Sequence, residues 1–140
     1  TRPEWIIRGD FSVQSGLQAA QSIFAMEDRP TAVFCASDEV AFGLVSGLKG
    51  LGIRVPEDIS IVGFDDIDLA QVFVPSLTTI RQDRHGIGAR AAEMLLDQLK
   101  PGQSAAKSGA TGPEVLSVEL VARDSTSQAG AHESPSIRRI

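Results

Sequence analysis

Two apolar runs, residues 32–36 and 59–64, constrain the fold of this chain more than any other feature. Runs of this length, bounded by turn residues, are typical of strands that are covered on both faces of a sheet. Each run is flanked by segments in which apolar residues recur at helical spacing. Strands separated by helices pair in parallel through right-handed crossovers. The sequence therefore predicts an α/β fold with a doubly wound, mostly parallel sheet.

The remaining elements continue this alternation along the chain. Further strands are expected at residues 5–8, 77–81 and 115–121. Helices are expected at residues 13–26, 38 to about 50, 68–73 and 85–99. Residues 101–113 are rich in Gly, Ser and Ala and are expected to form a loop. Residues 125–140 have little apolar content and are expected to form a disordered tail.

Length and charge narrow the class of protein. With 140 residues and 42% hydrophobic content, the chain suits one soluble domain with a true core. The net charge is −5 and the basic residues are scattered, so this chain lacks the basic face of a DNA-binding protein. No secretory signal opens the sequence, and no apolar stretch approaches the roughly 20 residues that span a membrane. The single cysteine, Cys35, is expected to be a buried small hydrophobe, and a cytoplasmic location is expected.

Signatures of enzymes are absent from the sequence. It contains no GxSxG elbow, phosphate-binding loop, CxxC pair or HExxH motif. The pair Asp65-Asp66 after a strand is similar to a phospho-receiver site, but Asp10 supplies only one further acid and Gln82 stands where a lysine is needed. His85 has no second histidine or cysteine near it, so no metal site is expected. We therefore expect neither an enzyme nor a cofactor.

The ends of the predicted strands carry the candidate binding residues. In open α/β sheets, ligands bind beyond the carboxyl ends of the strands. Phe11, Ser37 and Asp65 follow three of these ends. The carboxylate of Asp65 could accept hydrogen bonds from neighbouring hydroxyls, and the ring of Phe11 could stack on the apolar face of a sugar. Weaker candidates on the same strand ends are Asp38, Asp66 and Gln82.

Each candidate also has a purely structural interpretation. Ser37 or Asp38 would serve equally well as the N-cap of the helix that follows. Asp66 could simply start the short helix after its strand, and Phe11 could belong to the core. These alternatives remain open at the level of sequence.

Three blocks of sequence resemble one known family. Residues 30–43 (PTAVFCASDEVAFG), 52–66 (GIRVPEDISIVGFDD) and 75–82 (PSLTTIRQ) are similar, in order and spacing, to the LacI/GalR family of bacterial transcription regulators. The similarity covers about residues 9–125. It implies a two-lobed regulatory domain, like that of periplasmic sugar-binding proteins, with a small effector held between the lobes.

The resemblance also implies roles for individual residues. The positions that match Phe11, Ser37 and Asp65 face the effector in this family, as stacking ring, polar contact and hydroxyl acceptor. The position that matches Arg84 lies at the crossover between the lobes. Many members carry Asn at the position of Ser37.

The family pattern divides the chain into parts. Residues 1–82 correspond to the C-terminal lobe, 83–113 to a helix and loop of the N-terminal lobe, 114–124 to the returning strand and 125–140 to the tail. The helix at 84–99 would then pack its apolar stripe elsewhere on the chain or on a second copy.

Together these features predict a ligand-sensing regulatory fragment. Its effector is expected to be a sugar or sugar derivative, its partner a second copy in a homodimer, and its DNA contacts those of an N-terminal helix-turn-helix that nothing in this sequence resembles. A periplasmic sugar-binding protein of a transport system is the alternative.

Overall fold

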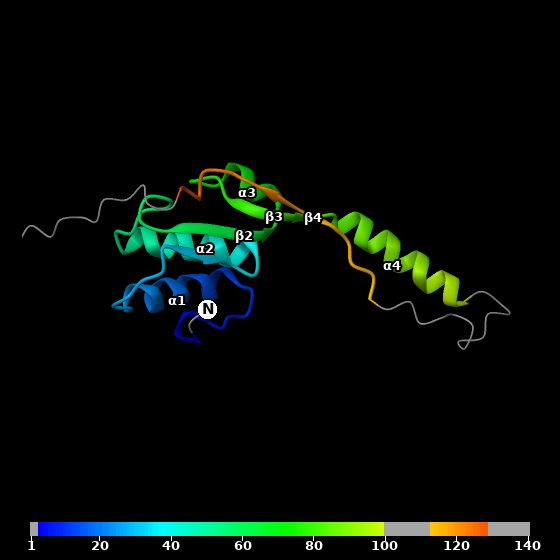
Figure 1. Cartoon of the computed structure of the whole chain (residues 1–140), viewed down its shortest axis with the longest axis horizontal. Helices are drawn as coiled ribbons and strands as arrows, with labels where there is room; N and C mark the ends of the chain where they lie inside the picture. Colours follow the sequence, from blue (N-terminus) through cyan, green and yellow to red (C-terminus); the bar gives the residue numbers. More distant parts are fainter. Residues whose placement is uncertain (1–2, 100–112, 129–140) are drawn as a thin grey trace, which may run out of the picture. The chain divides into compact units, whose positions relative to one another are not determined.

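A computed structural model describes residues 3–99 and 113–128 of the chain (Figure 1). The helices are α1 (Val13–Phe24), α2 (Asp38–Gly50), α3 (Asp68–Val72) and α4 (Arg84–Leu99), with a short 3-10 helix at Pro3–Trp5. The strands are β1 (Ala32–Phe34), β2 (Ser60–Asp65), β3 (Thr78–Gln82) and β4 (Val118–Val121), in the sheet order β1-β2-β3-β4. Since β1 pairs in parallel with β2 and β2 in parallel with β3, the predicted α/β fold with a mostly parallel sheet is confirmed.

The chain forms two compact units. The first comprises residues 1–81 and 120–140, and the second residues 82–119. The chain therefore leaves the first unit after Arg81 and returns to it at Leu120. The assignment of these parts to two lobes stays a prediction. The predicted loop at 101–113 lies almost wholly outside the described residues.

The core of the first unit is built on α1, α2 and the sheet. Helix α2 contacts both β2 and α1 (Figure 1). The two helices approach closely because glycines face each other: a Cβ on Gly16 would collide with the carbonyl oxygen of Val40, and one on Gly43 with that of Val13. Buried apolar side chains from these elements then form a continuous cluster that includes Ile23, Leu44, Leu48, Ile61 and Leu77. This packing fixes the sheet that carries the candidate site.

The predicted strand at residues 5–8 is wrong. Residues 3–5 form the 3-10 helix instead, and the amide of Ile6 donates to the carbonyl of Pro3 at 3.1 Å, which closes a turn. Ile6 is 64% exposed, so its apolar side chain gains little from burial in this conformation. Within the described residues, the strands paired in parallel are therefore β1, β2 and β3, and residues 5–8 do not join them.

The predicted tail begins too early. Ser125 is fully buried between β2 and β3: its hydroxyl donates to the carbonyl of Ile61 at 2.6 Å and accepts the amide of Thr78 at 2.8 Å. Its own carbonyl accepts the amide of Ile61 at 2.8 Å. Low apolar content suggested disorder, but short hydroxyl side chains can pair with backbone groups at the start of a sheet. Residues 129–140 lie outside the described residues.

The second unit contains α4, which confirms the predicted helix. In this helix no residue is buried, and the apolar side chains of Ile87, Leu95, Leu96 and Leu99 are exposed. Arg90 holds the unit together locally through ion pairs with Glu93 at 3.1 Å and Glu114 at 2.9 Å. Within residues 3–99 and 113–128, none of the helices has the length and apolar character that crossing a membrane requires.

Candidate functional site

The loop after β1 brings two of the predicted residues together. Ser37 is buried and caps α2, since its hydroxyl accepts the amide of Val40 at 3.3 Å. The same hydroxyl donates to the carbonyl of Phe11 at 3.5 Å. Phe11 has a positive φ of 66° and is 61% exposed, so its ring lies outside the core. Ser37 thus serves as a helix cap and also holds the loop that presents Phe11.

An apolar cavity of about 390 Å³ adjoins Phe11 in the first unit. Residues from the N-terminal segment, α1 and the β1 region line it, among them Trp5, Ala19, Phe34 and Ala36. Cys35 also lines it, but burial, with a smaller effect from the charge of Asp38, raises the pKa of its thiol to about 12. As predicted, Cys35 is therefore a buried small side chain, and its thiol stays protonated at neutral pH.

Ser37 and Asp65 lie at the carboxyl ends of neighbouring parallel strands. β1 pairs with β2 up to Phe34 and Val62, and β1 ends at Phe34, three residues before Ser37. β2 continues to Asp65, its last residue. Asp65 itself pairs with Arg81 of β3. The carboxyl ends of β1, β2 and β3 therefore present polar side chains at one edge.

The junction between β2 and α3, residues 65–67, has unusual backbone angles, and we call it the β2–α3 turn. Asp65 has a φ of 121° and Asp66 a φ of 53°, both in the left-handed half of backbone space. Outside glycine, Asp and Asn are the residues that best tolerate such angles. Two such residues in succession connect β2 to α3, which begins at Asp68.

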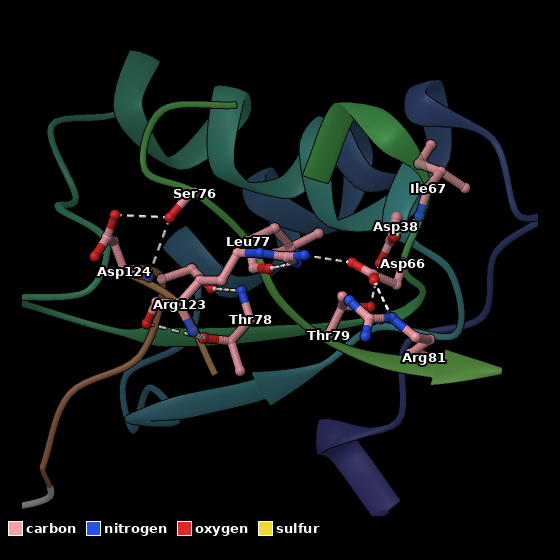
Figure 2. A network of polar contacts seen from close by, with 11 residues as sticks. Asp38, Asp66, Ile67, Ser76, Leu77, Thr78, Thr79, Arg81, Arg123 and Asp124 are labelled. Carbon is pink, nitrogen blue, oxygen red and sulfur yellow. Dashed lines mark hydrogen bonds and ion pairs between the residues drawn. The ribbon is translucent and has the colours of Figure 1, made fainter. Parts of the chain in front are cut away.

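Asp66 is held by two arginines at this turn (Figure 2). Its Oδ2 accepts Nε of Arg81 at 2.7 Å and its Oδ1 accepts Nη2 of Arg123 at 2.6 Å. Burial tends to raise the pKa of this carboxyl, but hydrogen bonds and charges from Arg123 and Arg81 outweigh it, and the pKa is lowered. Asp66 does not cap α3, which starts at Asp68 after Ile67. Since both oxygens are engaged, the geometry favours a structural role for Asp66.

Asp38 lies on the other side of the same turn. It is fully buried, its Oδ2 accepts the amide of Ile67 at 2.9 Å, and its Oδ1 accepts the hydroxyl of Thr79 at 2.5 Å. A Cβ at residue 63 would collide with Oδ1, so Gly63 makes room for this carboxylate. Burial raises the pKa of Asp38 above its usual range, and the nearby charges of Asp65 and Asp66 add to the effect. Asp38 therefore joins α2, the turn and β3.

The remaining predicted residues lie in the second unit. Gln82 ends β3, and Arg84 is the exposed first residue of α4. Asp83, between them, accepts the amide of Gly86 at 2.8 Å and so supports the start of the helix. A role of Gln82 or Arg84 in binding stays a prediction.

The sequence analysis missed the arginines of this site. Arg81 was counted as strand, and only the residues after it were considered. Arg123 lies 57 positions from Asp66, near the end of the expected returning strand, and no local pattern signals such a pairing. The parallel register of β2 and β3 is the one clue that could have placed Arg81 beside the turn.

No group of three or more His, Cys, Asp or Glu side chains within residues 3–99 and 113–128 is arranged to hold a metal ion.

Comparison with known families gives the site its context: the model of the periplasmic binding protein-like domain matches residues 1–126. The chain belongs to this family. The similarity to LacI-type regulators, first indicated by sequence motifs, is also confirmed by the relatives described next.

Three known proteins place this periplasmic binding protein-like chain among regulators. The HTH-type transcriptional repressor CytR of Escherichia coli K12 is 46% identical over 124 residues, which are 89% of this chain and 35% of the repressor. A LacI family transcriptional regulator of Enterococcus faecalis V583, solved with bound ribose, is 36% identical with a TM-score of 0.71, over 84% of this chain and 41% of that one. The lac repressor dimer, bound to operator and the anti-inducer ONPF, is also 36% identical, with a TM-score of 0.73, over 84% of this chain and 39% of that one.

These relatives are repressors and regulators, with no enzyme among them. The chain spans 35% of the length of the CytR repressor that it matches.

Proposed function

We propose that this chain is the effector-sensing part of a LacI-type transcription regulator and that it binds a small polar molecule, a sugar or sugar derivative. The observation that carries the proposal is the shared edge of the sheet. Ser37 follows the carboxyl end of β1, Asp65 ends the neighbouring parallel strand β2, and the hydroxyl of Ser37 holds the loop of Phe11. An exposed ring next to hydroxyl and carboxylate groups suits a ligand with one apolar face and several hydroxyls.

The proposed roles follow from the chemistry of each side chain. Phe11 would stack on the ring of the ligand, and Asp65 would accept hydrogen bonds from its hydroxyls. Ser37 would contact the ligand directly or through water, since its hydroxyl already serves the helix and the Phe11 loop. The ribose-bound relative supports a sugar as the class of effector.

In the longer protein, effector binding would change the affinity for DNA through a helix-turn-helix segment outside this chain, in the cytoplasm. We also propose a homodimer. The exposed apolar side chains of α4 and the dimeric form of the lac repressor support it. Light scattering after size exclusion tests this point, and a monomer at all concentrations would contradict it.

Ligand binding can be tested directly on the chain. A thermal-shift series with ribose, other sugars and nucleosides should raise the melting temperature for at least one of them, because a ligand that binds only the folded state stabilises it. Asp65→Asn and Phe11→Ala should each reduce the shift. Asp68→Asn is the control, because Asp68 is an exposed carboxylate of α3, outside the sheet edge. If Asp65→Asn and Asp68→Asn respond to the ligands alike, Asp65 is not part of the site.

The alternative, a periplasmic transport protein, makes a different prediction about the gene. A regulator would have a helix-turn-helix encoded upstream of this segment, and a transport protein would have an export signal. Sequencing the whole gene decides between them.

A further inference from the structure

We propose that Asp66, Arg81 and Arg123 form a clamp that positions the carboxylate of Asp65 for the effector. The inference rests on the proposed role of Asp65 in binding. It assigns Asp66 as a positioning residue that acts on the ligand through its neighbour.

The first support is the turn itself. Asp65 and Asp66 both have positive φ angles, which non-glycine residues adopt at a cost and keep only where the surroundings enforce them. The direction of the Asp65 side chain depends on these angles. Whatever holds the turn in this conformation therefore determines where the carboxylate of Asp65 lies.

The second support is how firmly the clamp is anchored. Arg123 is 14% exposed at its side chain and Asp66 8%, so their ion pair is shielded from water and from salt. Nη1 of Arg123 also donates to the carbonyl of Leu77 at 2.7 Å. The amide of Arg123 donates to Thr78 Oγ1 at 2.8 Å, and the same hydroxyl donates back to the carbonyl of Arg123 at 3.1 Å. Arg123 is thus fixed to β3 before it reaches Asp66 (Figure 2).

The third support is that the turn is held from its other side as well. Asp38, buried at the start of α2, accepts the amide of Ile67, the residue that follows Asp66. The turn lies between this bond and the two arginines. Such a double restraint is what a binding carboxylate needs, because a preorganised partner loses little freedom when the ligand arrives.

The position of the arginines along the chain adds a consequence. Arg81 is the last residue before the chain leaves the first unit, and Arg123 lies three residues after its return at Leu120. One carboxylate therefore ties both connecting segments to the turn that bears Asp65. A change at Asp65 on ligand binding would reach both segments through Asp66.

A purely structural role for the clamp would predict a loss of stability and nothing specific at Asp65. The variants Asp66→Asn and Arg123→Lys separate the two explanations. Asn tolerates the same backbone angles as Asp but lacks its charge, and Lys keeps the charge of Arg without its paired geometry. Asp68→Asn serves as the matched control on the same loop and helix.

The first measurement needs no ligand. Hydrogen–deuterium exchange of the full chain should show faster exchange of the amides of residues 65–67 in Asp66→Asn, with α1 and α2 unchanged. Equal protection of residues 65–67 in the native chain and in Asp66→Asn would overturn the clamp, whatever the chain binds.

The second measurement is a double-mutant cycle on binding, with ribose as the probe. Asp66→Asn should weaken ribose binding about tenfold, on the scale of one misplaced charge-assisted hydrogen bond, and Arg123→Lys less. In the double variant, adding Asp66→Asn to Asp65→Asn should weaken ribose binding no further, because Asp66 acts through Asp65. Additive losses, or an Asp66→Asn variant that binds like the native chain while Asp65→Asn does not, would refute the positioning role and leave the proposed function standing. If Asp65→Asn binds ribose as the native chain does, the proposed function fails at Asp65 and the positioning role fails with it.

Discussion

The regions around Asp38 and Asp66 hold buried carboxylates in two different ways. Asp38 has neutral partners, the amide of Ile67 and the hydroxyl of Thr79, whereas Asp66 has two arginines. Burial therefore dominates at Asp38 and raises its pKa, while the arginines dominate at Asp66 and lower it. The pKa values of these two acids thus shift in opposite directions because of their partners, and burial alone does not decide the direction.

Removal of Arg123 should have the largest effect of any single change at this turn. Arg123→Leu leaves Asp66 buried with Arg81 alone and removes the donor to Leu77. We expect a loss of about 3 kcal/mol in the free energy of unfolding, as is typical when one partner of a buried ion pair is removed. Urea denaturation measures it. If Arg123→Leu and the native chain unfold at the same urea concentration, the arginines do not outweigh burial at Asp66, and the contrast with Asp38 fails.

Removal of the Asp38 carboxylate should lower the free energy of unfolding slightly less than Arg123→Leu does. Asp38→Ala leaves the amide of Ile67 and the hydroxyl of Thr79 without their acceptor in a buried place, at about 2–3 kcal/mol. Asp38→Asn keeps an acceptor and should recover most of this loss. Equal stability of the Ala and Asn variants in urea would show that the hydrogen bonds to Asp38 contribute nothing.

As the pH falls, the contributions of Asp66 and Asp38 to the free energy of unfolding should change in opposite directions. The folded-state pKa of Asp66 lies below the unfolded value near 3.8, so its stabilisation is complete above 3.8 and is lost as the pH falls through the lower pKa. The folded-state pKa of Asp38 lies above 3.8, so the folded state gains stability as the pH falls from that pKa toward 3.8.

Urea denaturation from about pH 7 to about pH 3 tests both signs. Asp66→Asn should flatten the acid loss of stability, and Asp38→Asn should steepen it. Parallel curves for the two variants would mean that Asp38 and Asp66 titrate alike, and the comparison would be wrong.

Parts of this picture could be predicted from sequence and parts could not. The apolar runs around Val33 and Ile61 predicted strands, and both segments form them. Burial on both faces was wrong for the first run, because Phe34 of β1 is 63% exposed. The same reasoning failed at residues 5–8, where Ile6 and Ile7 have strand-like character but remain exposed in the described structure. The local sequence pattern indicates which secondary structure a segment could form. Whether the segment pairs as a strand depends on a neighbouring strand from elsewhere in the chain.

The polar residues of the site show the same limit. The strand-end rule placed Ser37, Asp65 and Asp66 at one edge, because a parallel sheet brings its carboxyl ends together. It could not distinguish Asp66, held inward by arginines, from Asp65 beside it. The partners Arg123 and Ser125 lie far along the chain, Arg123 in the expected returning strand and Ser125 in the segment whose composition suggested disorder. Their role depends on long-range packing, which short patterns do not encode.

A smaller effect is expected at the cap of α2. Ser37→Ala removes the acceptor for the amide of Val40 and should cost about 1 kcal/mol. Ser12→Ala is the matched control, because Ser12 caps α1 by accepting the amide of Ser15 at 3.1 Å. The two variants should lose similar stability, and only Ser37→Ala should also weaken ligand binding through Phe11. A ligand affinity that Ser12→Ala lowers as much would assign Ser37 a capping role only.

The smallest effect is expected at Arg90 in the second unit, which carries the same ion-pair chemistry as Arg123 without the burial. Arg90 pairs with Glu93 and Glu114, and the hydrogen bonds that Arg90 donates to Glu114 are the first cause of its raised pKa. These side chains are all exposed to water, where ordering two long side chains offsets most of the attraction. The melting temperature of Arg90→Ala should match that of the native chain, and added salt should change neither. If Arg90→Ala destabilises the chain as much as Arg123→Leu does, burial is not what makes the Asp66 clamp strong, and its two arginines owe their effect to geometry alone.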